Sequence, residues 1–188
     1  MSDYHVLKNA SLTALNANEN VVVIGSGAGG VIGENNFSIG KNSLTAANGA
    51  VRNIAIGNNS LYSNVTTNNL TAIGYQAMYS NTSGAGNIAV GYQALYNTTT
   101  GEKNTAIGYH SMYSNTTGEY NAAIGTDSLR ANTTGEQNVA LGHNSLYNNT
   151  SGFGQVAGGY RSLFENTTGN YNTGMVLKLF KTILLVLT

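Results

Sequence analysis

A glycine-rich turn after an apolar stretch is the segment of this sequence that most suggests chemistry. Residues 21–24 are β-branched, and Gly25, Gly27 and Gly30 follow them in the spacing Gly-x-Gly-x-x-Gly. In dinucleotide-binding folds this spacing opens a helix whose N-terminus holds a pyrophosphate, and an acidic residue follows about 20 positions later. Residues 31–36 have a sequence that disfavours a helix, and they lead directly into a repeat. We therefore expect a glycine-cornered first coil of that repeat and no nucleotide site.

The histidines and a row of glutamates are the remaining candidates for acid–base or metal chemistry. His5, His110 and His143 lie in different sequence environments, without acidic residues at ligand spacing. Three glutamates occupy the same position in successive copies of the repeat, and if stacked they would repel one another unless well solvated. We expect no catalytic residues, no cofactor and no metal, with calcium on the glutamate row as the alternative. The sequence thus predicts a protein that is not an enzyme. The three glutamates of the row are Glu102, Glu119 and Glu136.

The composition excludes several other classes of function. Only 9% of the 188 residues are charged, against roughly 25% in ordinary domains, and Lys+Arg 8 balances Asp+Glu 8. Nucleic-acid binding needs clustered cations, which the sequence lacks, so we expect no nucleic-acid partner. There is no cysteine to form a disulfide or a thiolate metal site. The 41% of apolar residues recur periodically, which favours burial over disorder.

A 17-residue repeat accounts for most of the chain. Its unit reads Asn-x-Ala-Ile-Gly-x-x-Ser/Ala-Leu-Tyr-x-Asn-Thr-Thr-Gly-x-x, and the glycine after Ile recurs once per unit from Gly40 to Gly159. Two helices do not fit this length, and each helical glycine would cost about 1 kcal/mol. We expect two short strands per unit, joined by corners and stacked on their copies at about 4.8 Å. The sequence predicts an all-β parallel β-solenoid, or β-roll, with 17-residue coils over residues 36–174, after an N-terminal cap and degenerate first coils over residues 1–35.

The Ala-Ile pair of each repeat predicts an apolar stripe on the outside of the solenoid. Successive side chains of a strand point to opposite faces, so an inward Ala106 places Ile107 outward. Exposed apolar stripes of this length are typical of interfaces, and we expect self-association, most simply a homotrimer around the rod axis. The alternative is a corner that turns both residues inward. The candidate assembly column is Ile56, Ile73, Val90, Ile107, Ile124 and Leu141.

The repeat resembles known fibre sequences. Residues 104–118 read Asn-Thr-Ala-Ile-Gly-Tyr-His-Ser-Met-Tyr-Ser-Asn-Thr-Thr-Gly. This resembles repeats of tail-fibre-like proteins of phages and large viruses, and is similar to lengthened Ala-Ile-Gly repeats of trimeric autotransporter adhesin heads. The tighter Ile-Gly spacing at Ile24, Ile32 and Ile39 resembles those heads more closely. The resemblance covers about residues 24–174 and implies a trimeric left-handed β-roll in a virion or extracellular surface fibre, a rigid rod for host or surface attachment without catalytic residues.

The tyrosine and Asn-Thr-Thr columns are the candidate contact surface for a host glycan or surface receptor. Aromatic rings stack on sugars, and amides and hydroxyls hydrogen-bond to them. The alternative is an ice- or mineral-surface binder, because Thr residues stacked at one height form a lattice. The same corners contain Asn-x-Ser/Thr sequons, which accept glycans only on a eukaryotic secretory route. The candidate contact residues are Tyr75, Tyr92, Tyr109, Thr116 and Thr133.

The repeat ends abruptly at an aberrant apolar tail, residues 175–188. The tail carries Lys178 and Lys181 and is shorter than the roughly 20 residues of a membrane helix, so we expect no membrane insertion. Synonymous codons exist for which the next reading frame from Met175 encodes Gly-Phe-Lys-Ala-Leu-Gln-Asn-Asn-Thr-Thr-Gly-Ile-Asn. That is another copy of the unit, in phase. We therefore interpret the tail as a frameshifted repeat.

Overall fold

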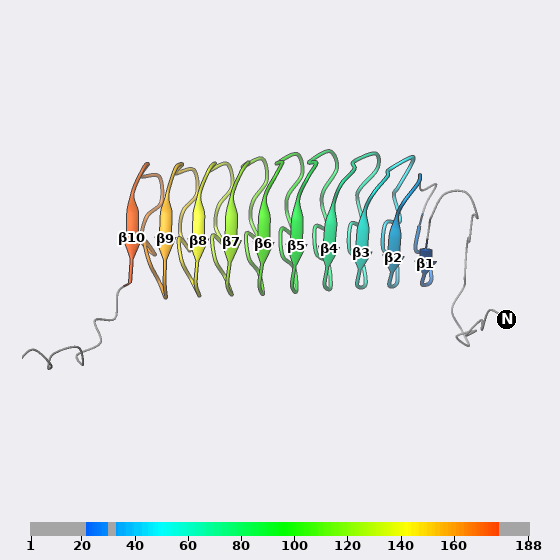
Figure 1. Cartoon of the computed structure of the whole chain (residues 1–188), viewed down its shortest axis with the longest axis horizontal. Coiled ribbons are helices and arrows are strands. Elements are labelled where there is room, and N and C mark those ends of the chain that lie inside the picture. The colour runs from blue at the N-terminus through cyan, green and yellow to red at the C-terminus, as the bar shows by residue number, and fades with distance from the viewer. Residues whose placement is uncertain (1–21, 30–32, 177–188) are drawn as a thin grey trace, which may run out of the picture.

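The computed structural model describes residues 22–29 and 33–176, which form a parallel β-solenoid (Figure 1). One sheet runs along the rod, with its ten strands in chain order and each strand parallel to the next. From β2 onward, partner residues such as Ala106 and Ala123 are 17 positions apart. The predicted parallel solenoid with 17-residue coils is confirmed. The strands are β1 (Val22–Ile24), β2 (Phe37–Ile39), β3 (Ile54–Ile56), β4 (Thr71–Ile73), β5 (Ile88–Val90), β6 (Thr105–Ile107), β7 (Ala122–Ile124), β8 (Val139–Leu141), β9 (Val156–Gly158) and β10 (Thr173–Met175).

The first described coil is shorter than the others. Val22 of β1 pairs with Phe37 of β2, a smaller separation along the chain than that between Phe37 and its own partner Ile54 in β3. Residues 25–29 after β1 form turns and bends, without the helix that a dinucleotide site requires at its pyrophosphate. Gly25 and Gly27 of the glycine-rich motif therefore lie in the corner of a first coil, as the sequence predicts, and Gly30 lies outside the described residues. β1 lies within residues 1–35, where an N-terminal cap and degenerate first coils are expected.

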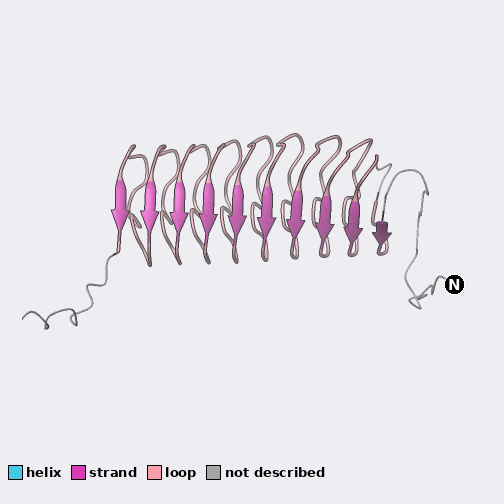
Figure 2. Ribbon diagram, in the orientation of Figure 1, coloured by secondary structure: helices cyan, strands magenta, loops and turns pink. Residues whose placement is uncertain are grey.

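The prediction of two strands per coil is wrong, because each described coil contains one strand (Figure 2). The Leu-Tyr pair of the repeat lies opposite the strand, and its Leu is left-handed, with φ of 48° at Leu61 and 52° at Leu95. Extended strands need φ near −120°. The backbone still bonds between coils here, since Leu61 N donates to Ala77 O at 3.0 Å. The second wall is thus a stack of hydrogen-bonded turns.

The glycine after each strand is required by the stacking. Gly108 has φ +139°, in a region essentially restricted to glycine. A Cβ on Gly108 would lie 2.4 Å from the carbonyl oxygen of Gly125 in the next coil. This column is glycine in every coil through Gly159, and Val176 occupies the next position. The glycine column therefore ends where the aberrant tail begins; residues 177–188 of that tail lie outside the described residues.

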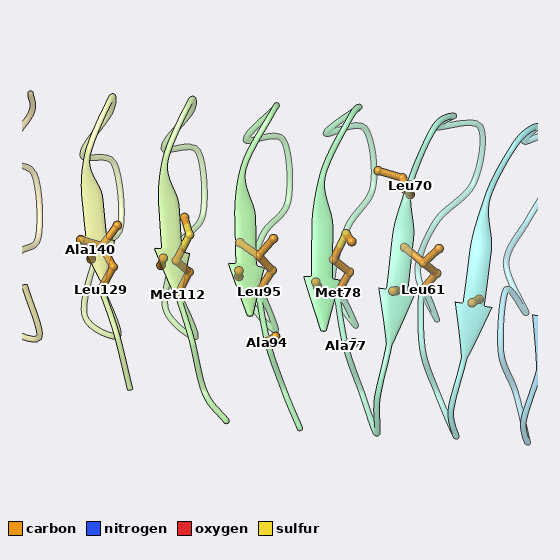
Figure 3. Close-up of a cluster of buried hydrophobic side chains, with 14 of the residues drawn as sticks. Leu61, Leu70, Ala77, Met78, Ala94, Leu95, Met112, Leu129 and Ala140 are labelled. Atoms are coloured by element: carbon orange, nitrogen blue, oxygen red, sulfur yellow. The ribbon is translucent and has the colours of Figure 1, made fainter. Parts of the chain in front are cut away.

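The apolar interior is narrow. The strand alanines face inward, opposite the left-handed Leu and Met residues of the second wall (Figure 3). Ala106, Met112 and Leu129 are all fully buried. Left-handed backbone costs roughly 1–2 kcal/mol at a non-glycine residue, and burying a Leu side chain gains about as much. The coil therefore tolerates this conformation because it directs the large side chain into the interior.

Two buried columns that consist mainly of asparagine line other parts of the interior. In the column before the strand, Asn104 Oδ1 accepts from Asn121 N at 3.0 Å, and Asn121 Nδ2 donates to Gly135 O at 2.8 Å. In the column of the Asn-Thr-Thr corner, Asn132 Nδ2 donates to Asn115 Oδ1 at 2.8 Å. Both columns are thus hydrogen-bonded ladders that run along the rod. We call this second column the inner ladder: Asn64, Asn81, Thr98, Asn115, Asn132, Asn149 and Asn166.

Candidate functional site

The outer face of the sheet is apolar along the rod. Ile107, Ile124 and Leu141 are 39%, 44% and 45% exposed, while the strand alanines beside them are fully buried. This is the orientation that strand alternation predicts, and the alternative corner with both residues inward is wrong for these coils. Ile56, Ile73 and Val90 continue the column and are partly exposed.

A second outward column lies two positions earlier in each strand, and the sequence analysis missed it. The same alternation places it on the outer face, but its residue type varies, so no motif marks it. Four of its large apolar members are 37–41% exposed. We call the two columns together the sheet face; the exposed members of the second column are Phe37, Ile54, Ile88 and Val156.

The sheet face is long and narrow. Ten strands give nine spacings of about 4.8 Å, or about 43 Å, and three residues at about 3.3 Å give a width of about 10 Å. The projected area of about 430 Å² lies within the roughly 300–600 Å² of the largest apolar patch on a typical monomer. In the ten described strands, neither outward column contains a charged residue.

An aromatic ladder borders the sheet face just beyond the corner glycines. Tyr75, Tyr92 and Tyr109 stack with ring centroids 5.4 and 5.1 Å apart and interplanar angles of 14° and 10°. They are 42–48% exposed. Each ring covers a face of its neighbour, so the ladder presents ring edges to solvent. The expected stacking of sugars is therefore blocked on the ring faces that neighbouring tyrosines cover.

A second aromatic ladder lies on the next corner. Tyr62, Tyr79, Tyr96 and Tyr113 stack at centroid distances of 4.9–5.2 Å. Burial, followed by the neighbouring tyrosines, raises the pKa of the Tyr96 phenol above its ordinary value. At the next coil Arg130 replaces the tyrosine, and its guanidinium lies 5.5 Å from the centre of the Tyr113 ring. The cation thus fills the gap in the aromatic column.

A polar group that contains His110 lies between the two ladders. His110 Nε2 lies 2.9 Å from Gln93 Oε1, and Nδ1 lies 3.7 Å from Asp127 Oδ1. Arg130 Nε contacts the same Asp127 oxygen at 3.1 Å. Burial lowers the pKa of His110; Asp127 opposes this shift and Arg130 reinforces it. Asp127 belongs to the adjacent repeat, and the stacking of coils places its carboxylate beside His110. The two residues are far apart along the sequence, so the sequence analysis did not pair them.

The other candidate metal groups are spread out. His143 is exposed beside Tyr160, with ring centroids 5.5 Å apart, and His5 lies outside the described residues. Glu102, Glu119 and Glu136 are partly or fully exposed. Within residues 22–29 and 33–176, no group of three His, Asp or Glu side chains could hold a metal ion.

The threonines of the Asn-Thr-Thr corner bond to the backbone. Thr116 Oγ1 donates to Thr133 O at 3.0 Å, and Thr133 Oγ1 donates to Thr150 O at 3.1 Å. Both side chains are half-buried. Their hydroxyl protons therefore point along the rod to the next coil.

Comparison with models of known protein families, with curated proteins and with solved structures finds no match for this chain. Within the part of the chain that the structure describes, no helix is long and apolar enough to cross a membrane. The case for a function therefore rests on the geometry of the solenoid and its surface columns.

Proposed function

We propose that this chain is a segment of a structural fibre on a virion or extracellular surface, in which three solenoids associate through their sheet faces. The observation that carries the proposal is the pair of uncharged apolar columns along the ten-stranded sheet. Such a face in contact with water is typical of an interface. The occupant that suits it is a second copy, because a copy offers an apolar face of the same length and coil spacing.

The free energy gained by burying the sheet face supports association, and the tyrosines that border the face contribute further. Burying about 430 Å² at about 25 cal/mol per Å² gives about 11 kcal/mol on each chain as an upper figure. Association costs about 4–15 kcal/mol in lost translational and rotational freedom. The sheet face alone therefore offsets much of that cost, and the bordering tyrosines Tyr75, Tyr92 and Tyr109 supply further contact area.

A rod of this kind gives reach and stiffness for attachment. Each coil is hydrogen-bonded to the next through both walls, and stability in such arrays accumulates coil by coil. A host glycan or surface receptor is the proposed ligand. Because the ring faces of the ladder are covered, we expect it to contact tyrosine edges and hydroxyls, and the Gln76–Gln93 amide pair, whose side chains lie 2.7 Å apart. A glycan array without binding by the intact fibre would count against this ligand.

The assembly proposal is tested by placing charge on the sheet face. Replacing Ile107 and Ile124 together by Asp should dissociate the chains and leave the solenoid folded, because both side chains point outward. The matched control is Thr117→Asp with Thr134→Asp, which adds the same charges one coil apart at exposed positions of another corner. Particle mass by sedimentation and far-UV circular dichroism report the two effects. Equal masses for both variants would refute the interface.

An ice- or mineral-binding solenoid is the second candidate, favoured by the threonines at one position of consecutive coils. A lattice-binding face needs hydroxyls directed outward, whereas Thr82, Thr99 and Thr116 donate theirs to carbonyl oxygens of the next coil at 3.0–3.3 Å. We therefore expect no thermal hysteresis in solutions of the purified protein. A clear gap between freezing and melting would favour this candidate over the fibre.

A further inference from the structure

The inner ladder coincides with a series of N-glycosylation sequons. Asn64, Asn81, Asn115, Asn132 and Asn149 each begin an Asn-x-Ser/Thr sequence, as does Asn166 in the last complete coil. The five named first are fully buried. The amide nitrogen that a glycan would modify thus lies inside the solenoid.

Both amide hydrogens are in use at Asn132 and Asn149 of the inner ladder. Asn132 Nδ2 donates to Asn115 Oδ1 at 2.8 Å and to Gly135 O at 3.0 Å. Asn149 Nδ2 repeats this pattern, donating to Asn132 Oδ1 at 3.0 Å and to Gly152 O at 3.1 Å. Neither nitrogen has a hydrogen to lose without breaking a buried hydrogen bond.

We propose that N-glycosylation of the inner ladder and formation of the solenoid exclude each other. Glycan transfer from a lipid pyrophosphate donor joins the anomeric carbon to Nδ2, breaks the bond from that carbon to the pyrophosphate oxygen, and releases the amide proton. The product has one amide hydrogen where Asn132 and Asn149 each use two. The product also carries a sugar inside a column that the adjacent coils close on both sides. The backbone of the corner glycine leaves no room there, since even a Cβ on Gly135 would lie 2.3 Å from Asn132 Oδ1.

The exclusion acts before folding. In the unfolded chain every sequon is extended and accessible, and the acceptor becomes buried only when coils stack. The hydroxyl residue that completes each ladder sequon is exposed in the fold, so burial of the asparagine is what protects it. The chain therefore forms its rod only where no glycan is transferred before folding. This limits its route to any extracellular surface, and it holds whether or not the rod is an attachment fibre.

Cell-free translation of the full chain behind a cleavable signal sequence tests the exclusion directly. Translation is run with microsomes, with and without an inhibitor of lipid-linked oligosaccharide synthesis. Glycan positions are mapped by mass spectrometry, and folding is read as a protease-resistant core. Asn97 begins another sequon and is only partly buried, so its glycan identifies chains that met the transferase. We expect those chains to carry glycans on ladder asparagines and to lose the resistant core, which inhibitor-treated chains retain.

A variant without the buried sequons is the matched control. The exposed hydroxyl residues that complete the ladder sequons become Ala, and Ser38→Ala removes the sequon of buried Asn36 while restoring the strand alanine of the repeat. This variant should keep its resistant core with glycan on Asn97. The proposal is overturned if chains glycosylated at Asn132 or Asn149 are as resistant as unmodified ones, or if chains modified at Asn97 leave those asparagines bare. The exposed replacements are Thr66→Ala, Ser83→Ala, Thr117→Ala, Thr134→Ala, Ser151→Ala and Thr168→Ala.

Discussion

The inner ladder is interrupted at Thr98, and the substitution Thr98→Asn should stabilise the solenoid. Asn81, in the preceding coil, is fully buried, and neither Nδ2 nor Oδ1 of its side chain has a hydrogen-bond partner. In the following coil, Asn115 Nδ2 reaches Thr98 Oγ1 only at 3.5 Å, against 2.8 Å between Asn132 and Asn115. An asparagine at position 98 would donate to Asn81 Oδ1 and accept from Asn115 Nδ2, as its counterparts do.

The expected gain follows from those two bonds. A net hydrogen bond contributes about 1 kcal/mol, so Thr98→Asn should raise the free energy of unfolding by about 1–2 kcal/mol. Asn and Thr have similar volumes, which avoids a packing penalty. Thr98→Val is the control, because it keeps the shape and removes the acceptor from Asn115. That variant should be less stable by about 1–3 kcal/mol.

The assay should be local, because long repeat arrays do not always unfold in one step. The amides of Thr82 and Thr99 donate across the coils on either side of position 98, both at 3.0 Å. Their native-state hydrogen exchange should slow by about 5- to 30-fold in Thr98→Asn, the factor that corresponds to about 1–2 kcal/mol. Unchanged or faster exchange in Thr98→Asn would refute the ladder reasoning, as would equal exchange in the two variants.

Three further predictions concern the corner glycines, the half-buried His110 and the tail. Gly108→Ala should lower the free energy of unfolding in urea by about 4 kcal/mol or more, because its Cβ meets a carbonyl oxygen. Gly86→Ala is the control: with φ +69° and its nearest neighbour 3.5 Å away, it should lower the same quantity by about 1–2 kcal/mol. Equal losses would contradict the stacking argument. Burial lowers the pKa of His110, so its stabilising contribution is complete above pH 6.5 and is lost as the pH falls through the folded-state pKa. His110→Gln places at this position the residue found in the two preceding coils, Gln76 and Gln93, and should make the free energy of unfolding less dependent on pH between pH 7 and about 5. An unchanged pH dependence would exclude His110 as its source. Sequencing the encoding DNA should reveal Asn-Asn-Thr-Thr-Gly in the alternative frame after Met175, and its absence would end the frameshift hypothesis.

The 17-residue period was sufficient to predict the solenoid and the outward Ile107 column, because strand alternation and coil stacking follow from spacing alone. It was insufficient for the second wall. The Leu-Tyr pair has residue types that are compatible with a strand. Leu61 is nevertheless buried through a left-handed turn, a conformation that β-propensity does not predict.

The side-chain columns were harder to predict than the backbone. Asn-Thr-Thr-Gly is a typical surface turn sequence, yet Asn132 is buried because a ladder of identical amides satisfies its hydrogen bonds. The tyrosine column was predicted from the sequence, while the covering of ring faces by stacking depends on side-chain torsions that the sequence leaves open. Likewise, His110 and Asp127 meet only because the solenoid places equivalent positions of neighbouring coils beside each other.

The mass of the unmodified protein in solution tests the central claim most directly. Sedimentation equilibrium over a range of concentrations should give three times the 19.6 kDa of one chain, with the sheet faces in contact. A mass of 19.6 kDa at every concentration would contradict the fibre proposal, since the apolar columns of the sheet would then remain in water along the whole rod.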